Sequence, residues 1–364
     1  MVRTRSRRRS GHRRRYLWIG LAAFAALAVF GALVRALQPG QWPVAERREA
    51  LPKTAMLLDG LFGGRFAGEM IADKDGLFPS NVVLRAKPDD PDFVATVARE
   101  HAIGVTTGQK FLLGAWRGIP VTAFAASRLD TSSAIFTWES SGPRNPADLV
   151  GKRIGYRRGS EGEVLFDVLM AQLGLPRSQI VKVPYQDGFD ALRSGAVDAV
   201  IAEVGQEFTP SDPDFARLKI IKPQDYGIHA PGLVYFASSA LLQDRPSTMG
   251  QVLEGLIKGW QLVYDDYSRS VPALVGFDPA GLSADRVRLE LQQQRVLIVP
   301  AAGRIAEYDE SRWKMLRDAL IFAKLGEETV PISQAVSYQL LRDVYRRSPN
   351  LAGPGAWSGV RAVK

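Results

Sequence analysis

DLVGKRIGYRRGSEGEVLFDVLM, residues 148–170, predicts a strand, a tight loop and a helix in direct succession. The strand covers KRIGYR, the loop turns at Gly159 and Ser160, and the helix begins at EGEV. Ser160 and Glu163 have the spacing of a capping box, in which the serine oxygen accepts from the third helical amide and the glutamate returns to the serine amide. The free N–H groups of such a helix start also suit a carboxylate, sulfonate or phosphate. Gly159, Ser160 or Glu161 would contact a ligand if this loop lines a cleft, although capping alone would explain Ser160 and Glu163.

The same loop does not have the sequence of a nucleotide-hydrolysing loop. It lacks the G-x-x-x-x-G-K-[ST] pattern. Gly151, Gly155 and Gly159 are spaced by four residues, which does not fit G-x-G-x-x-G either. Nucleotide hydrolysis is therefore not predicted.

Strands and helices alternate on both sides of this stretch, which predicts two α/β halves with parallel strands. The predicted strands of the first half lie within residues 54–62, 81–87, 101–107 and 119–127, and its helices within 66–76, 92–100 and 108–118. The second half has strands within 152–157, 179–185 and 196–203, and helices within 161–174 and 188–195. From residue 247 the chain turns mainly helical, and we expect these helices to wrap back over the first half. Two such halves joined by extended crossovers predict a hinge and a central ligand cleft.

The positive charge of the chain belongs to its N-terminal end. The formal net charge of the 364 residues is +9, and residues 1–36 contain nine arginines and no acidic residue. The rest of the chain is therefore balanced, whereas a nucleic-acid-binding domain is expected to carry a basic face on its fold. We expect no nucleic-acid partner.

An apolar run follows the first arginines. Residues 16–34 carry no charge, and as a helix these 19 residues would span about 28 Å, close to the thickness of a bilayer core. We expect residues 1–15 to be a basic cytoplasmic region, residues 16–34 a transmembrane signal anchor and residues 35–52 a linker, so that the body is exported. Small residues at positions 34 and 36 leave cleavage by a signal peptidase as the alternative.

The chain contains no cysteine. This excludes a disulfide framework, thiolate catalysis, zinc bound by cysteine and lipid attachment through an N-terminal cysteine. No nucleophile and base pair or metal cluster stands out either, so we expect neither an enzyme nor a cofactor or metal.

The order of these segments resembles the type-II periplasmic substrate-binding proteins of ABC importers, in the branch for nitrate, aliphatic sulfonates, taurine and thiamine-pyrimidine precursors. The resemblance covers roughly residues 54–335, and its most specific part is Asp-Leu-x-Gly-Lys-x-Ile-Gly at residues 148–155 followed by Gly-x-Val-Asp-Ala at 195–199. Residues 225–238, DYGIHAPGLVYFAS, look like the return crossover of the thiamine-precursor branch. Further matching stretches lie at residues 64–78, 102–126, 156–175, 191–194 and 308–320.

The resemblance implies an α/β fold of two lobes with a hinge and a central cleft. Lobe 1 is expected to comprise residues 53–140 and 235–345, lobe 2 residues 141–234, and a C-terminal tail residues 346–364. In open α/β sheets ligands bind at the carboxyl ends of the strands, and the resemblance places the loop at Gly159 in the cleft.

Several side chains at these strand ends are candidates for ligand contact, each with a structural alternative. Phe62 is expected to stack on a planar ligand and Arg65 to pair with an anionic one, or to pack locally. Thr106 or Thr107 either caps a helix or directs its hydroxyl into the cleft. Glu203 ends an apolar run and must be paired or exposed in the cleft. The remaining candidates are Arg128 and Ser132 in the crossover and the aromatic residues Tyr185 and Tyr226 on opposing loops.

Three functions fit a closing cleft. The first is an exported solute-binding protein, on the periplasmic or extracellular face and held to the cytoplasmic membrane by its N-terminal helix, that delivers a small molecule to an ABC permease. The second is a membrane-anchored ligand sensor. The third is an enzyme related to the eukaryotic pyrimidine synthase, whose cysteine-rich motif this chain lacks. For the ligand, Phe62, Tyr185, Glu203 and Tyr226 favour a planar heterocycle, whereas Arg65, Arg128 and Arg158 favour an anion.

Overall fold

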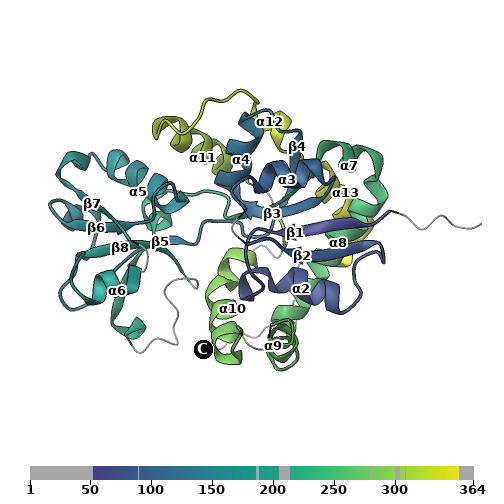
Figure 1. Ribbon diagram of the computed structural model, residues 1–364, viewed down its shortest axis with the longest axis horizontal. Coiled ribbons are helices and arrows are strands. Elements are labelled where there is room, and N and C mark those ends of the chain that lie inside the picture. Colours follow the sequence, from purple (N-terminus) through teal and green to yellow (C-terminus); the bar gives the residue numbers. More distant parts are fainter. Residues whose placement is uncertain are drawn as a thin grey trace, which may run out of the picture. The chain divides into compact units, whose positions relative to one another are not determined.

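The computed structural model describes residues 52–88, 90–185, 188–204, 214–278, 281–299, 304–307 and 309–351. Two five-stranded sheets organise these residues, and each sheet forms the centre of one lobe (Figure 1). Residues 16–34, where a membrane helix is expected, lie outside the described residues. Among the residues that the structure describes, no helix is both long enough and apolar enough to cross a membrane.

The first sheet has the order β2-β1-β3-β10-β4. β1 pairs parallel with β2 and β3, as the repeated β-α-β pattern predicts, whereas β10 is antiparallel to both β3 and β4. Its strands are β1 (Thr54–Leu58), β2 (Val82–Ala86), β3 (Ile103–Thr107), β4 (Val121–Ala126) and β10 (Leu233–Ser238), and the intervening helices are η1 (Gly64–Phe66), α2 (Ala67–Lys74), α3 (Phe93–Arg99) and α4 (Gly108–Trp116). The sheet is thus completed by a strand that returns after the second lobe.

The second sheet has the order β7-β6-β8-β5-β9, with β5 antiparallel to β8 and β9. Its strands are β5 (Ser133–Trp138), β6 (Arg153–Tyr156), β7 (Val181–Pro184), β8 (Ala199–Glu203) and β9 (Leu218–Ile221). Helices α5 (Glu161–Gln172) and α6 (Gly188–Arg193) and the short turns η2 (Pro146–Leu149), η3 (Arg177–Gln179), η4 (Phe215–Arg217) and η5 (Pro223–Tyr226) complete it. Because β5 belongs to this sheet, lobe 2 begins at Ser133, earlier than the expected residue 141. Its apolar run pairs with β8 on one side and with β9 on the other.

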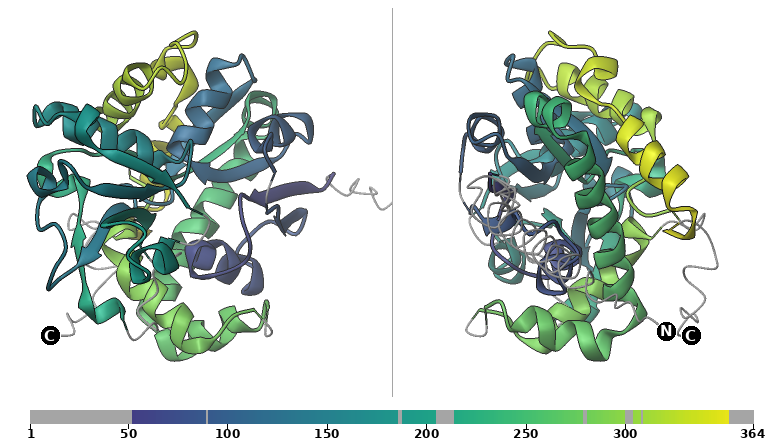
Figure 2. Two further views of the ribbon diagram at one scale, coloured as in Figure 1. Left: turned by 60° about the vertical axis from the view of Figure 1, so that its left-hand side comes forward. Right: turned by 90° about the vertical axis from the view of Figure 1, so that its right-hand side faces the viewer.

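The C-terminal helices lie mainly on lobe 1. The long helix α8 (Pro246–Asp265) packs against α2, and α13 (Gln339–Arg347) runs beside α8 (Figures 1 and 2). Helix α11 (Glu310–Phe322) contacts α4 of lobe 1 and α5 of lobe 2. The other elements are α7 (Ser239–Asp244), α9 (Tyr267–Val275), α10 (Ala284–Ile298), α12 (Ile332–Ala335) and η6 (Pro349–Leu351).

Two glycines allow α2 and α8 to cross closely. A methyl group at Gly259 would lie closer than 3.0 Å to the carbonyl oxygen of Gly68, and one at Gly68 would meet the indole ring of Trp260 equally closely. Trp260 is fully buried. Its indole N–H donates to the hydroxyl of Tyr235 at 2.9 Å, which in turn donates to the carboxyl of Glu69 at 2.7 Å.

Glu69 lies in α2, close to Ser127, the first residue of the crossover from β4 to β5. It is completely buried, and besides Tyr235 it accepts a hydrogen bond from Ser127 Oγ at 3.3 Å. Burial raises the pKa of Glu69 to about 7, against the lowering effect of these hydrogen bonds and of the nearby Arg128. A carboxyl group with a pKa near neutral pH therefore joins α2 to Ser127.

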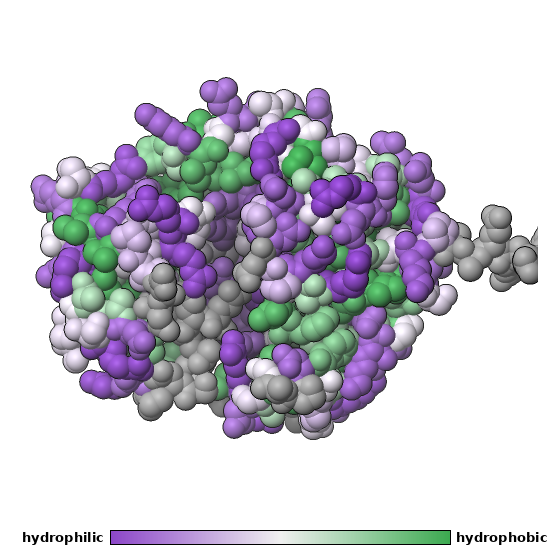
Figure 3. All heavy atoms as spheres, viewed as in Figure 1, coloured by the Kyte–Doolittle hydropathy of each residue, from purple (hydrophilic) through white to green (hydrophobic). Residues whose placement is uncertain are grey.

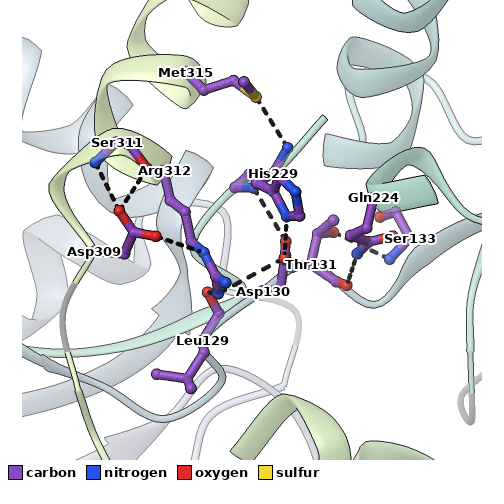
Figure 4. A network of polar contacts seen from close by, with 11 residues as sticks. Leu129, Asp130, Thr131, Ser133, Gln224, His229, Asp309, Ser311, Arg312 and Met315 are labelled. Carbon is purple, nitrogen blue, oxygen red and sulfur yellow. Dashed lines mark hydrogen bonds and ion pairs between the residues drawn. The ribbon is translucent and has the colours of Figure 1, made fainter. Parts of the chain in front are cut away.

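Residues 127–132 and 222–232 link the two sheets, and a network of polar contacts ties them together (Figure 4). Asp130 is bonded to the His229 ring at 2.6 Å and to Arg312 of α11 at 3.7 Å. Gln224 donates from its side-chain amide to the carbonyl oxygen of Thr131 at 2.7 Å. The two crossovers and α11 are thus held as one connected layer.

Candidate functional site

A cavity of about 700 Å³ lies between the lobes. Figure 3 shows this face of the molecule hollowed between the two lobes, with hydrophilic side chains on both sides. Lobe 1 contributes the loop after β1, the start of α4 and one side of α10, and lobe 2 contributes the loop before α5 and the end of β8. These are the carboxyl ends of β1, β3, β6 and β8, where ligands of α/β sheets bind.

The structure brings eight of the twelve predicted site residues to this cavity: Phe62, Arg65, Thr107, Arg128, Gly159, Ser160, Glu161 and Glu203. The other four do not line it. The hydroxyl of Thr106 donates to the carboxylate of Asp59, and Tyr185 donates to the carbonyl oxygen of Ile201 at 2.7 Å. Ser132 lies behind the cavity wall, and Tyr226 lies in η5, where its carbonyl oxygen accepts from Gln172. Strand-end position alone therefore does not decide which side chains face the cavity.

An ion pair joins the lobes across the cavity. Arg65 of η1 donates from Nη1 to Glu203 Oε2 at the end of β8, at 3.3 Å. Glu203 also accepts from Ser132 Oγ at 3.2 Å. The side chains are 16% and 29% exposed, so the pair is partly screened by solvent and can rearrange. Arg65 and Glu203 therefore provide a cation and an anion on opposite lobes.

Arg128 is a buried cation without a carboxylate contact among the described residues. It is 4% exposed and donates to Ser132 Oγ at 3.2 Å and to Gln294 Oε1 at 2.7 Å. Its Nε atom is buried and has no partner in the described part of the chain. Burial lowers the pKa of Arg128 to about 10, and the charge of Arg65 acts in the same direction. The guanidinium is still protonated at neutral pH and suits an anionic group.

The loop before α5 differs in detail from the expected capping box. Ser160 Oγ accepts from the backbone N–H of Glu163 at 3.2 Å, as predicted. The Glu163 carboxylate, however, accepts from the N–H of Gly159 at 2.8 Å, because the N–H of Ser160 donates to the carbonyl oxygen of Arg157. Gly159 has φ +74°, a left-handed conformation that favours glycine and makes this tight turn.

Gln109 forms a second contact between the lobes. This residue, in the first turn of α4, is 6% exposed and donates from Nε2 to the carbonyl oxygen of Gly159 at 3.0 Å. Its Oε1 atom is buried with no partner in the described residues. Sequence reasoning missed Gln109, although its place just after Thr107 at a strand end could have indicated it.

Asp59 and α10 supply further groups that were not predicted. Asp59 follows β1 directly and accepts from Lys110 Nζ at 2.9 Å, which neutralises it. From α10, Glu290 accepts from the N–H of Gly64 at 2.9 Å, and Gln294 donates to the carbonyl oxygen of the same glycine. No local motif marks these two residues beyond their spacing of four on one helix.

Glu161, the first residue of α5, directs its carboxyl group into the cavity wall. Its Oε2 atom accepts from the hydroxyl of Thr131 at 2.6 Å, whereas Oε1 is enclosed and has no partner among the described residues. Burial raises the pKa of Glu161 to about 8, and the negative charges of Glu203 and Asp130 add to this effect. The charge of Arg65 opposes it.

Comparison with known proteins places these features in a family context. The family model described as "NMT1/THI5 like" matches residues 65–268, more than half of the chain. No curated protein sequence matches the chain.

Solved structures share the fold. The periplasmic aliphatic sulphonate-binding protein of Escherichia coli has 15% identity and a TM-score of 0.64, over 79% of this chain and 92% of that one. The alkanesulfonate-binding protein of Xanthomonas axonopodis pv. citri, bound to MOPS, has 17% identity and a TM-score of 0.60, over 78% and 98%. The desulfurization enzyme DSZB has 14% identity and a TM-score of 0.56, over 81% and 99%. At these identities the likeness shows the two-lobed periplasmic-binding-protein fold alone, a fold that serves binding proteins and an enzyme.

Proposed function

The chain belongs to the NMT1/THI5-like family, and from this premise we propose that it is a solute-binding protein that captures a small molecule between its lobes and delivers it to an ABC importer. Family membership agrees with the resemblance that residues 148–155 and 195–199 indicated. The observation that carries the proposal is the cavity of about 700 Å³ with charged groups from both lobes, a volume typical of small-molecule sites. A ligand that bridges Arg65 and Glu203 would favour the closed arrangement, which an importer can recognise.

For the ligand we propose a small organic anion. Arg65 and Arg128 both line the cavity, and Arg128 has no carboxylate contact among the described residues. Two aromatic side chains that favoured a heterocycle, Tyr185 and Tyr226, lie outside the cavity lining. The third, Phe62, packs against Phe277 at 5.5 Å between ring centroids. The charged groups therefore support an anion better than the aromatic groups support a planar ring.

We also propose that the body lies on the periplasmic or extracellular side, held to the cytoplasmic membrane by residues 16–34. The support is the order of eight arginines followed by an apolar run in the sequence. The E. coli protein of the same fold is periplasmic by its name. An anchored binding protein would stay close to its permease.

A thermal-shift screen of the full-length protein tests the proposed function. We expect butane-1-sulfonate, taurine, nitrate or hydroxymethylpyrimidine to raise the Tm, because a ligand that binds only the folded state adds about 2.7 kcal/mol of stability at a hundredfold excess over its Kd. For an anionic ligand, Arg65→Met is expected to weaken binding by about 100-fold, since it leaves a charged partner unpaired.

Arg153→Met is the matched control for this substitution. Arg153 also pairs with a carboxylate, Asp198, at 2.9 Å, but lies on β6 outside the cavity lining. This variant should bind as the wild type does. A screen in which no compound changes the Tm, or an equal loss in both variants, would contradict the proposal.

A further inference from the structure

The cavity contains polar atoms that no described residue satisfies. Arg65 Nε, Arg128 Nε, Gln109 Oε1 and Glu161 Oε1 are all buried, all belong to residues that line the cavity, and none has a hydrogen-bond partner in the described residues. Buried polar groups in folded proteins are nearly always hydrogen-bonded. Because these atoms are also closed to water, a ligand in the cavity contacts them only when the side chains rotate toward it.

Glu161 differs from the other acids of the cavity in having no cation in contact among the residues that the structure describes. Asp59 pairs with Lys110 at 2.9 Å, Glu203 with Arg65 at 3.3 Å and Glu290 with Arg286 at 2.8 Å. Glu161 instead accepts a hydrogen bond from the hydroxyl group of Thr131. A buried carboxylate without a cation is costly, and such a group keeps its proton instead.

The surroundings of Glu161 act in the same direction. Glu203 faces it from β8 and Asp130 from the first crossover, and both carry negative charge. Arg65 faces it from η1, but its guanidinium is already bonded to Glu203. Together with burial, these charges explain why the pKa of Glu161 rises to about 8.

The hydrogen bonds of Thr131 indicate which oxygen of Glu161 holds the proton. Thr131 Oγ1 accepts from the backbone N–H of Ser133 at 3.1 Å and donates to Glu161 Oε2, 2.6 Å away. With Oε2 as an acceptor, the proton of a neutral Glu161 lies on Oε1, the atom without a partner in the described residues. A protonated Oε1 is a hydrogen-bond donor.

We propose that Glu161 determines specificity by keeping its proton in the cleft and donating a hydrogen bond from Oε1 to an acidic group of the ligand, so that anions bind more tightly from acid than from alkaline solution. This role rests on the proposed function, in which Arg65 and Arg128 bind the same anion. Two cationic donors and one neutral donor would then surround the anion, while Gln109 Oε1 accepts from an N–H or O–H elsewhere on the ligand. An ionised Glu161 would repel the anion.

Titration of the full-length protein with butane-1-sulfonate between pH 5.5 and 9.5 tests this role, because the charge of this probe does not change over that range. We expect the wild-type affinity to fall about 30-fold from pH 6 to pH 9.5 as Glu161 loses its proton. Glu161→Gln supplies an amide N–H in place of the acid, so its affinity should stay constant with pH. Glu161→Ala should bind weakly at both ends of the range.

Glu254→Gln is the matched control. Glu254 pairs with Lys258 at 2.7 Å on α8, away from the cavity, so this variant should keep the pH dependence of the wild type. Binding of butane-1-sulfonate without pH dependence, or equal pH dependence in Glu161→Gln, would overturn the role of Glu161 and leave the proposed function standing. No binding by any variant at pH 5.5 would overturn the anion ligand itself, and the role of Glu161 with it.

Discussion

Gly259→Ala is expected to lower the free energy of unfolding by about 3 kcal/mol. The added methyl group would lie closer than 3.0 Å to the carbonyl oxygen of Gly68 and 2.9 Å from the Cβ atom of Ala72. Backbone atoms cannot move aside as a flexible side chain can, so α2 and α8 must separate and loosen the packing around Trp260. Urea unfolding of the variant and the wild type measures the difference.

Gly250→Ala on the same helix is the matched control. A methyl group there would first meet the guanidinium of Arg347, at 2.5 Å, which is the end of a flexible side chain. Helix α8 should gain up to about 1 kcal/mol from the better helix propensity of alanine. Equal destabilisation by the two substitutions would contradict the close crossing as the cause.

The second large effect concerns pH. The pKa of Glu69 is about 7 in the folded protein, above its usual value of 4.5, so the folded state binds the proton more tightly than the unfolded state does. The stability from this protonation is fully present below pH 4.5 and is lost as the pH rises through 7. The shift corresponds to about 3 kcal/mol in the free energy of unfolding.

Glu69→Gln should abolish this contribution, because the amide stays neutral at every pH. We expect the stability difference between the variant and the wild type to grow from pH 4.5 to pH 8 in favour of the variant, as measured by urea unfolding. Glu161 is present in both proteins, so its titration cancels in the stability difference. The difference therefore reports on Glu69. A difference that does not change with pH would show that Glu69 is ionised throughout.

Periodicity predicted most of the fold, because amphipathic helices alternate with short apolar strands in both lobes. It missed β5, β9 and β10, the last of which lies in a stretch interpreted as the return crossover. The run SAIFTW at Ser133–Trp138 is buried along nearly its whole length and so lacks the alternation of a half-buried strand, and β9 has only four residues. The expected start of lobe 2 at residue 141 left the residues of β5 in lobe 1.

The sequence predicts those residues of the candidate site that lie at strand ends. It does not predict those that reach the cavity through contacts between elements far apart in the chain. Glu203 is the last residue of β8 and Gly159 lies three residues after the end of β6, and both line the cavity. Glu290 and Gln294 reach the cavity only because α10 packs against η1, more than 220 residues earlier in the chain. Tyr185 also follows a strand, but its hydroxyl turns to the backbone of β8. Side-chain direction is set by such neighbours, which local sequence does not contain.

The position of β10 between β3 and β4 has a consequence for biosynthesis. Among the described strands, β4 pairs only with β10, and β3 leaves one edge open until β10 is in place. A ribosome or an export channel releases β1 to β4 long before Ser238, so these strands must wait with unpaired edges while the whole of lobe 2 emerges. Lobe 2 holds all its strands between Ser133 and Ile221, so it can fold first, and its completion brings β10 to the gap.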